Sequence, residues 1–407
     1  MKGGFWALEK PSFRIFYLSK STRLFKILPK CLVSLFLLSI NLIPLNFFAQ
    51  ATNLEYEKIQ VGDVQNHLVW LALSPDQKTV AISSTQSYPF YIYDFQNRKL
   101  VKTFDIGEWY AGARIRYSRT GKYLLFQQLY YMDYAPNKDR EVNFEIIDAN
   151  TGAEVINFSN YHSVDISPNE KYAVTHSGDD VAYWNLMTKD KEKSFNVKDA
   201  TNSVAISRDG KLVAVSHLPW KEDLKKNPMY LNNKKNQSIL EKYKQQITVY
   251  DAATFQPKYT INDFYDIVYD LNYSDDGNYL FIYSVPHTKI QGPSGRTGYV
   301  SVANAMTGEP MRNAFGSISL YDVDYKLSPN GRLFGIVSNG KFPEVHIYDF
   351  MSNDMLARFE LSFKMFQKSD DGSKLPTDLR ASFTFLPDNR HVLITFGNRL
   401  LLWDTGL

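Results

Sequence analysis

A short turn sequence that recurs seven times along the chain is the feature that most constrains its fold. The copies resemble Ser-Pro-Asp-Gly-Lys, and they occupy residues 74–78, 118–122, 167–171, 207–211, 274–278, 328–332 and, more loosely, 386–390. In such a turn Pro fixes φ, Asp or Asn bonds to the nearby backbone, and Gly adopts a positive φ. The chain is therefore predicted to consist of seven versions of one small unit.

A second recurring feature follows each turn. It is an aromatic or apolar residue followed by Asp or Asn, at Tyr93-Asp94, Ile147-Asp148, Trp184-Asn185, Tyr250-Asp251, Ala303-Asn304, Tyr348-Asp349 and Trp403-Asp404. The segments before the first turns alternate large apolar and variable residues with a period of two, which indicates strands and not helices. Units of four strands that recur about every 40 to 50 residues predict a β-propeller.

The two ends of the chain predict how the ring closes. The last unit ends at Leu407 without a fourth strand, whereas residues 54–60 form a strand-like segment that belongs to no unit. Pairing these two parts would complete the last unit and remove an open sheet edge. We therefore predict an all-β fold, a seven-bladed β-propeller closed by pairing the mature N-terminal strand with the last, C-terminal blade.

With these repeats the chain resembles the WD40-like propellers, including the exported repeat proteins of the YVTN and TolB groups. The resemblance covers nearly all of the chain after residue 51. Trp403-Asp404 is its one literal Trp-Asp pair, and no Gly-His dipeptide stands where strict WD40 repeats place one. The chain thus resembles the divergent, exported branch more closely, and this resemblance implies a binding or scaffolding role.

The first 51 residues have the layout of an export signal. Seven basic residues precede an apolar run from Cys31 to Phe48, and Ala49-Gln50-Ala51 supplies the small residues of a cleavage site. We predict a signal peptide over residues 1–51, a WD40-like propeller domain over residues 52–407, and a periplasmic or extracellular location. The alternative is an uncleaved signal anchor, which would tether the protein to the membrane through a single span.

The rest of the chain has 39 basic and 42 acidic residues and no cysteine. Nucleic-acid binding requires clustered positive charge, so we expect no nucleic-acid partner. An exported chain without disulfides must be held together by its core. We expect a monomer without a cofactor.

Long connections are predicted on one face of the ring. Connections alternate between the two faces of a propeller, and the long ones (residues 128–142, 217–246, 285–298 and 362–380) all leave from the same ends of the strands. Loops on a rigid scaffold commonly carry binding residues. This long-loop face is therefore the candidate binding surface.

Aromatic and histidine side chains are frequent in these connections. The candidate binding residues are Trp109, Tyr110, Tyr130, Tyr131, Tyr134, His162, Trp220, Tyr230, Phe264, Tyr265 and His287. Rigid rings offer a large contact area at low entropic cost, which suits a protein, peptide or glycan ligand. The alternative for any one of them is packing of a loop base against its blade.

The insertion at residues 218–246 is the most distinctive of these loops. It carries seven lysines and three acidic residues, and residues 238–246 are predicted to form a short helix. One interpretation is a docking arm for an acidic partner or an anionic glycan. The other is a solvated loop that has no partner.

Charged residues also alternate along the innermost strands, where they would face the central channel. They are Arg114, Arg116, Asp165, Asp270, Asp324 and Lys326. Two interpretations remain open for them: a site for a small ion or polar ligand, or mutual pairing within the channel.

The sequence contains no nucleophile elbow, phosphate-binding glycine loop or His-Glu-x-x-His motif, and its seven histidines have no metal-ligand spacing. We therefore predict a non-enzymatic, exported propeller that binds a protein or polymer through its long-loop face, with no metal site. The alternative is a propeller enzyme of the lactonase or lyase type that uses the mouth of the channel. His162, Asp270 and Asp322 are the nearest candidates for such chemistry.

Overall fold

The computed structural model describes residues 55–63, 66–85, 89–105, 107, 109–130, 141–291, 297–317, 323–339, 342–362 and 380–407. The chain divides into two units, Met1–Ala49 and Gln50–Leu407, and all described residues belong to the second. The predicted boundary of the signal peptide lies outside the described residues.

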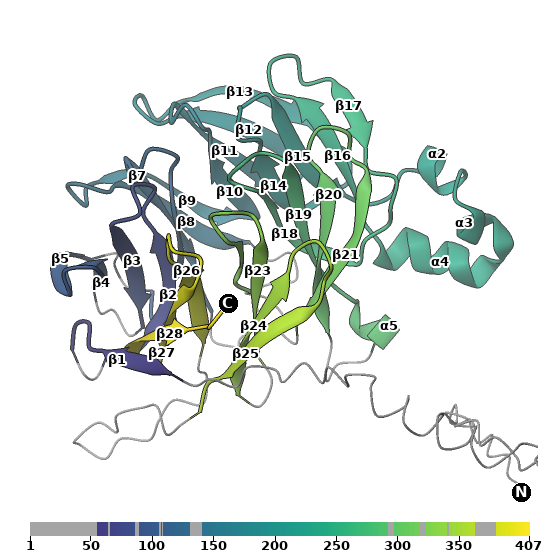
Figure 1. Cartoon of the computed structure of the whole chain (residues 1–407). Helices are drawn as coiled ribbons and strands as arrows, with labels where there is room; N and C mark the ends of the chain where they lie inside the picture. The colour runs from purple at the N-terminus through teal and green to yellow at the C-terminus, as the bar shows by residue number, and fades with distance from the viewer. Residues whose placement is uncertain are drawn as a thin grey trace, which may run out of the picture. The chain divides into compact units, whose positions relative to one another are not determined.

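Within the described residues, seven four-stranded antiparallel sheets stand around a common centre (Figure 1). From the first blade to the seventh the strands are β2 (Leu68–Leu73), β3 (Thr79–Ser84), β4 (Phe90–Asp94), β5 (Lys99–Phe104); β6 (Ala113–Tyr117), β7 (Tyr123–Gln128), β8 (Val142–Asp148), β9 (Glu154–Tyr161); β10 (Ser163–Ile166), β11 (Tyr172–Ser177), β12 (Asp180–Asn185), β13 (Lys191–Asn196); β14 (Ala200–Ile206), β15 (Leu212–His217), β16 (Gln246–Asp251), β17 (Pro257–Thr260); β18 (Ile267–Tyr273), β19 (Tyr279–Val285), β20 (Gly298–Asn304), β21 (Pro310–Ser317); β22 (Tyr325–Leu327), β23 (Leu333–Asn339), β24 (Pro343–Asp349), β25 (Met355–Glu360); and β26 (Ala381–Phe385), β27 (His391–Phe396), β28 (Arg399–Asp404), β1 (Tyr56–Ile59). The predicted seven-bladed propeller is confirmed.

The recurring Ser turn joins the first two strands of a blade through a repeated set of hydrogen bonds. In six of the seven turns the Ser hydroxyl accepts the backbone N–H five residues later, at 2.9–3.0 Å. In five of them it also donates to the Asp or Asn two residues later, at 2.5–2.8 Å. The fourth residue has a positive φ in all seven turns, including Gln77, Glu170 and Asn389. The recurring sequence pattern thus reflects one turn geometry that is repeated in every blade.

The recurring Asp or Asn caps the second tight turn of a blade, between the third and fourth strands. Its side-chain oxygen accepts backbone N–H groups from two and three residues later at Asp148, Asn185, Asp251, Asn304 and Asp349. At Asp251 these N–H groups, from Thr254 and Ala253, lower the pKa of the carboxyl to about 2. Hydrogen bonds to the charged form explain this direction.

The core lies between the blades and not in one central mass. Each buried cluster combines side chains from neighbouring sheets, and the largest of them includes Phe359, Phe383 and Trp403. Gly335 on β23 permits this packing, because a Cβ atom there would lie 2.4 Å from the ring of Phe383. Close packing of this kind holds adjacent blades at a fixed separation.

Strand β1 completes the seventh blade. It pairs antiparallel with β28, from Tyr56 opposite Trp403 to Ile59 opposite Leu400. The Tyr56 ring meets Phe359 of the sixth blade edge-on at 5.5 Å, and Ile59 is 7% exposed. The start and end of the described chain are therefore joined in one sheet.

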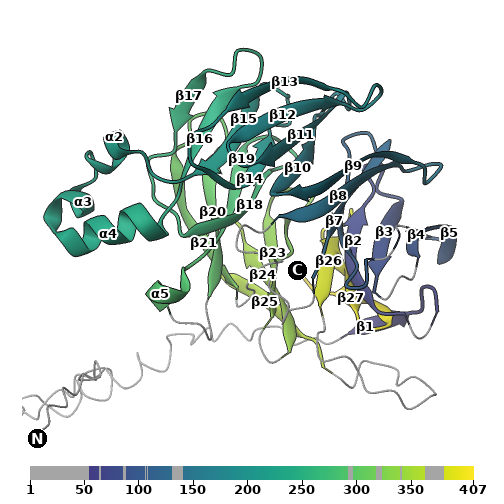
Figure 2. The ribbon, with the colours of Figure 1, turned by 180° about the vertical axis from the view of Figure 1, so that it is seen from behind.

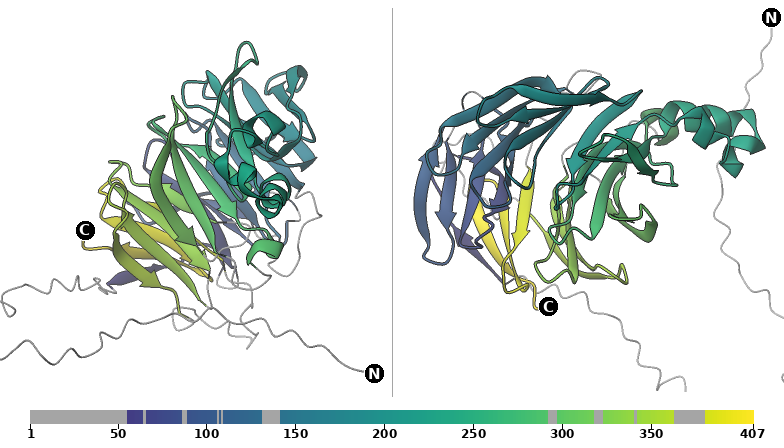
Figure 3. Two further views of the ribbon diagram at one scale, coloured as in Figure 1. Left: turned by 90° about the vertical axis from the view of Figure 1, so that its right-hand side faces the viewer. Right: turned by 90° about the horizontal axis from the view of Figure 1, so that it is seen from above.

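Among the described residues, four short helices interrupt the β structure on the long-loop side. They are α2 (Lys221–Leu224), α3 (Pro228–Asn232), α4 (Lys234–Tyr243) and α5 (Thr288–Gln291). Helices α2 to α4 belong to the connection between β15 and β16 and project outward from the ring (Figures 1 and 2; Figure 3, right). Of the described helices, none has the length and apolar character needed to cross a membrane.

We predict that β1 contributes directly to stability. A chain that begins at Val61 should lose about 3 kcal/mol relative to one that begins at Glu55, because it leaves Ile59 and Tyr56 out of the core. It should also self-associate, because β28 then presents an open edge. Thermal unfolding and size-exclusion chromatography of the two chains test this, and equal melting temperatures would contradict it.

Candidate functional site

The long-loop face and the channel are the two places where the structure gathers the candidate residues. The strand ends at Gln128 and Val142, His217 and Gln246, and Val285 and Gly298 agree with the predicted long connections. All of these connections leave from the end of the blade opposite the tight turns. We call the opposite surface, formed by the tight turns between the first and second and between the third and fourth strands of the blades, the short-turn face.

The insertion between β15 and β16 is anchored at both ends. Trp220 stacks on His217 with ring centroids 4.1 Å apart, and Leu224 and Leu240 are 1% and 4% exposed. At the other end the Lys244 ammonium lies 2.7 Å from the buried Asp266 carboxylate. The sequence predicted one helix at residues 238–246. The structure places α4 at Lys234–Tyr243, after an Asn233 cap whose side chain accepts the Asn236 N–H.

The insertion displays positive charge on this anchored base. Its exposed lysines are Lys221, Lys225, Lys226, Lys234, Lys235 and Lys242. The acidic side chains of the insertion are partly engaged within it, since Glu241 accepts a bond from the Tyr230 hydroxyl at 2.9 Å and Asp223 pairs with Lys226 at 3.0 Å. Leu231 of α3, which lies between these lysines in the sequence, has a side chain that is 64% exposed.

The candidate aromatic residues do not form one exposed cluster. Tyr110 is 56% exposed, whereas Tyr265 is 2% exposed and packs in the core between the fourth and fifth blades. Tyr265 therefore fills a loop base and offers no ring surface to a partner. Trp109 and Tyr130 are half-buried against neighbouring core clusters.

The other candidates of this set lie in separate places. The His287 ring lies 4.6 Å from Tyr243 of α4, and Phe264 is half-buried. Tyr131 and Tyr134 lie outside the described residues.

His162 lies against a buried histidine that the sequence did not single out. The rings of His162 and His176 are 5.1 Å apart, and His176 is fully buried with its Nε2 atom 2.7 Å from the Gly178 carbonyl oxygen. Burial, with a smaller contribution from the charge of His162, lowers the pKa of His176 to about 4. His176 is therefore neutral at ordinary pH.

The channel is spanned by an ion pair between opposite blades. Arg114 of the second blade lies 2.8 Å from the Asp270 carboxylate of the fifth blade, and the two side chains are 11% and 15% exposed. The Tyr325 hydroxyl donates to the same Asp270 oxygen at 2.6 Å, and the guanidinium lies over the Trp70 ring at 5.3 Å. Burial alone would raise the pKa of Asp270, but the charge of Arg114 holds it below its ordinary value.

A second ion pair lies within the sixth blade, and its carboxylate is hydrogen-bonded to the seventh blade. The Lys326 ammonium lies 2.6 Å from Asp324, a residue that is 4% exposed. Asp324 also accepts hydrogen bonds from the Ser382 hydroxyl at 2.6 Å and the Phe383 N–H at 2.9 Å. The six predicted channel residues are therefore engaged with each other or with the backbone of a neighbouring blade.

Arg116 and Asp165 are the other two predicted channel residues, and they lie one level nearer the short-turn face than Arg114. Arg116 donates to the Val164 carbonyl at 2.9 Å and lies 3.8 Å from Asp165. Asp165 in turn accepts the N–H of Ile206 at 3.1 Å. These bonds favour the interpretation of the channel charges as internal pairs.

Sequence reasoning missed Tyr325 and Ser382, although a signal for Ser382 exists. The residues four positions before each repeat turn are Trp70, Arg114, Ser163, Ser203, Asp270, Asp324 and Ser382. Aligning the seven turns would have placed Ser382 at the level of Arg114 and Asp270. Tyr325 occupies the neighbouring position, where the other blades carry apolar residues, so its hydroxyl gave no separate signal.

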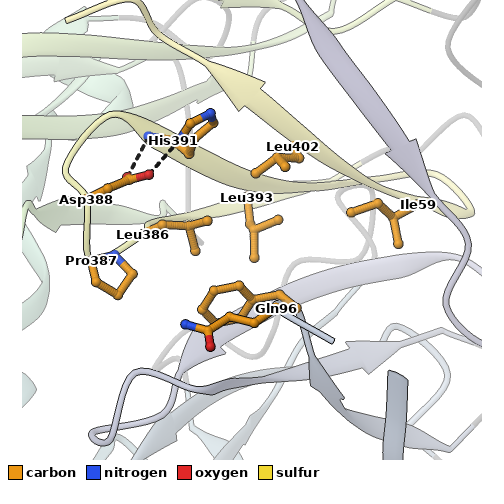
Figure 4. Close-up of a pocket in the computed structure, with 9 residues that line it drawn as sticks. Ile59, Gln96, Leu386, Pro387, Asp388, His391, Leu393 and Leu402 are labelled. Atoms are coloured by element: carbon orange, nitrogen blue, oxygen red, sulfur yellow. Dashed lines mark hydrogen bonds and ion pairs between the residues drawn. The ribbon is translucent and has the colours of Figure 1, made fainter. Parts of the chain in front are cut away.

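A cavity of about 320 Å³ opens on the short-turn face between the seventh and first blades (Figure 4). It forms where Leu386 replaces the turn serine, and its lining is mainly apolar. The Asp388 carboxylate and the His391 ring, 2.6 Å apart, stand at its edge. It can accept a small apolar group beside this polar pair.

The described residues contain no group of three or more His, Cys, Asp or Glu side chains that could hold a metal ion. The absence of a metal site stays a prediction. Asp322, one of the enzyme candidates, is also outside the described residues.

Comparison with solved structures shows the fold of the chain. No family model and no curated protein matches the chain. The crystal structure of the β-propeller domain of Myceliophteria thermophila Cps50 (Swd1) is similar, with a TM-score of 0.56 and 11% sequence identity over 86% of this chain and 99% of that domain. The chain has the fold of a seven-bladed β-propeller. Because 1516 solved chains share this similarity, it does not indicate a particular function.

We predict that breaking the channel ion pair costs more than breaking an exposed one. Asp270→Asn leaves the buried Arg114 charge without its partner, and should lower the free energy of unfolding by about 3–5 kcal/mol. Adding Arg114→Met should restore at least half of this loss. The control, Arg98→Met, breaks a pair with Glu57 whose side chains are 40% and 57% exposed, and should cost less than about 1 kcal/mol. Chemical denaturation measures the wild type and the three variants, and a double variant no more stable than Asp270→Asn would contradict the prediction.

We also predict that His176 makes stability depend on pH. Its folded-state pKa of about 4 lies below the ordinary 6.5, so its contribution is fully present above pH 6.5 and is lost as the pH falls towards 4. The loss should be on the order of 3 kcal/mol. His176→Gln keeps a donor for the Gly178 carbonyl and should flatten the unfolding free energy over this range. An unchanged slope in that variant would show that another group is responsible.

Proposed function

We propose that the protein is an exported binding scaffold that recognises an acidic protein surface through its long-loop face. The anchored, lysine-rich insertion between β15 and β16 is the observation that carries this proposal. A WD40-like propeller is consistent with a protein-binding scaffold. The export signal predicted at residues 1–51 supports the location outside the cytoplasm.

The insertion has the physical properties of a docking arm. Its base is fixed by Leu224, Leu240 and the Lys244–Asp266 pair, so little conformational entropy remains to be lost on binding. The insertion presents six exposed lysines and the exposed apolar side chain of Leu231. Clustered charge steers an oppositely charged partner, while an apolar side chain at the centre supplies contact energy.

The enzyme alternative has less support from the channel. Asp270, one of its candidates, is held by Arg114 and Tyr325, and His162 lies beside His176. A catalytic carboxylate must be available to a substrate. The paired channel residues therefore support the binding scaffold as the better proposal.

We predict that a photo-crosslinking residue at position 231 will capture one protein with an acidic surface in the producing cells. Replacing Lys221, Lys225, Lys226, Lys234, Lys235 and Lys242 by Gln should lower the yield about tenfold, because the electrostatic attraction is lost. The same loss should follow from raising the salt concentration.

The matched control replaces six exposed lysines of the short-turn face, Lys78, Lys99, Lys122, Lys171, Lys189 and Lys211. These changes should leave the yield within twofold of the wild type. Equal losses in both sets, capture of a polysaccharide instead of a protein, or no capture at all would contradict the proposal. Intact-mass analysis of the same preparation shows whether residues 1–51 have been removed.

A further inference from the structure

The second residue of each repeat turn lies where the inner strands end on the short-turn face. These residues are Pro75, Arg119, Pro168, Arg208, Asp275, Pro329 and Pro387. Consecutive turns approach each other through this position: a Cβ atom at Gly210 would lie 3.6 Å from Pro168, and one at Gly277 would lie 3.5 Å from Arg208. The three charged residues therefore lie in a ring of equivalent turn positions, and the other four positions are prolines.

Two of these charged residues are arginines that are directly linked. Arg119 Nη1 donates to the backbone carbonyl of Arg208 at 2.8 Å, which fixes its guanidinium beside the Arg208 turn. Arg116 lies one level further into the channel. Burial lowers the pKa of Arg208, and the positive charges of Arg119 and Arg116 lower it further, so the three cations act on one another.

The nearby carboxylates compensate this charge only in part. Asp165 accepts the N–H groups of Ile166 and Ile206 and lies 3.8 Å from Arg116. Asp275 pairs with Arg208 Nη2, but its side chain is 90% exposed. The Arg208 Nε atom is buried and has no hydrogen-bond partner. A buried donor of this kind costs free energy unless a ligand or water satisfies it.

We propose that Arg119 and Arg208 bind a phosphate group at this mouth of the channel, with Arg116 adding positive charge from one level deeper in the channel. The planar guanidinium fork matches the oxygens of a phosphate. Two forks from the turns of the second and fourth blades, which the Arg119–Arg208 hydrogen bond brings together, can hold it from two sides. The Asp275 carboxylate, paired with Arg208, occupies the place that a phosphate oxygen takes. The site is on the face opposite the long loops, so it does not depend on the proposed function.

The test is isothermal titration of the full chain with inorganic phosphate, and separately with phenyl phosphate, at constant ionic strength. Saturable binding at one site is expected. Arg119→Gln and Arg208→Gln should each weaken it at least about tenfold, because a charge-assisted bond is lost. Asp275→Asn should tighten binding, because it removes the competing carboxylate. Lys78→Gln, which removes an exposed charge from the same face, should stay within twofold.

Each outcome bears on the proposal. Tighter binding of phenyl phosphate than of inorganic phosphate assigns the site to a phosphorylated ligand, and the reverse assigns it to the free ion. Absence of saturable binding, or an equal loss in Lys78→Gln, overturns the proposal. If Arg208→Gln does not fold, the two exposed substitutions at Arg119 and Asp275 still decide it, since they predict opposite changes in affinity.

Discussion

The inner edge of each blade is the constraint on which this ring depends. The first strand of a blade pairs with one strand of its own sheet, so its other edge presents unpaired N–H and C=O groups. Side chains of the preceding blade bond to several of these groups: Arg116 to the Val164 carbonyl, Asp165 to the Ile206 N–H, and Asp324 to the Phe383 N–H. The polar residues of the channel are therefore part of the fold itself.

The ion pair between Arg114 and Asp270 adds a different connection. The second and fifth blades are three blades apart, which is the largest separation in a ring of seven. A 2.8 Å contact between them means that side chains span the channel at this level. The other bonds each join neighbouring blades, whereas this pair joins the two halves of the ring.

The turns could be predicted from the sequence because they are local. The Ser, Asp and positive-φ positions of each turn bond within five residues, so the pattern contains the whole cause. The partner of Arg114 could not be predicted in this way, since Asp270 lies 156 residues away and the ring geometry alone brings them together. The burial of Tyr265 could not be predicted either. Loops have no periodic pattern, so the sequence does not distinguish a buried loop aromatic such as Tyr265 from an exposed one such as Tyr110.

The bonds already made by Arg116 restrict how an anion could bind beside it. If a phosphate drew Arg116 away from Val164, it would leave a carbonyl at the inner edge of the third blade without that donor. Arg119 and Arg208 hold no inner strand edge, because Arg119 donates to a carbonyl of the Arg208 turn and Arg208 Nε is unpaired. A ligand that uses those two residues gains charge-assisted bonds without opening the ring, so the mouth of the channel can bind an anion while the structural pairs above it remain intact.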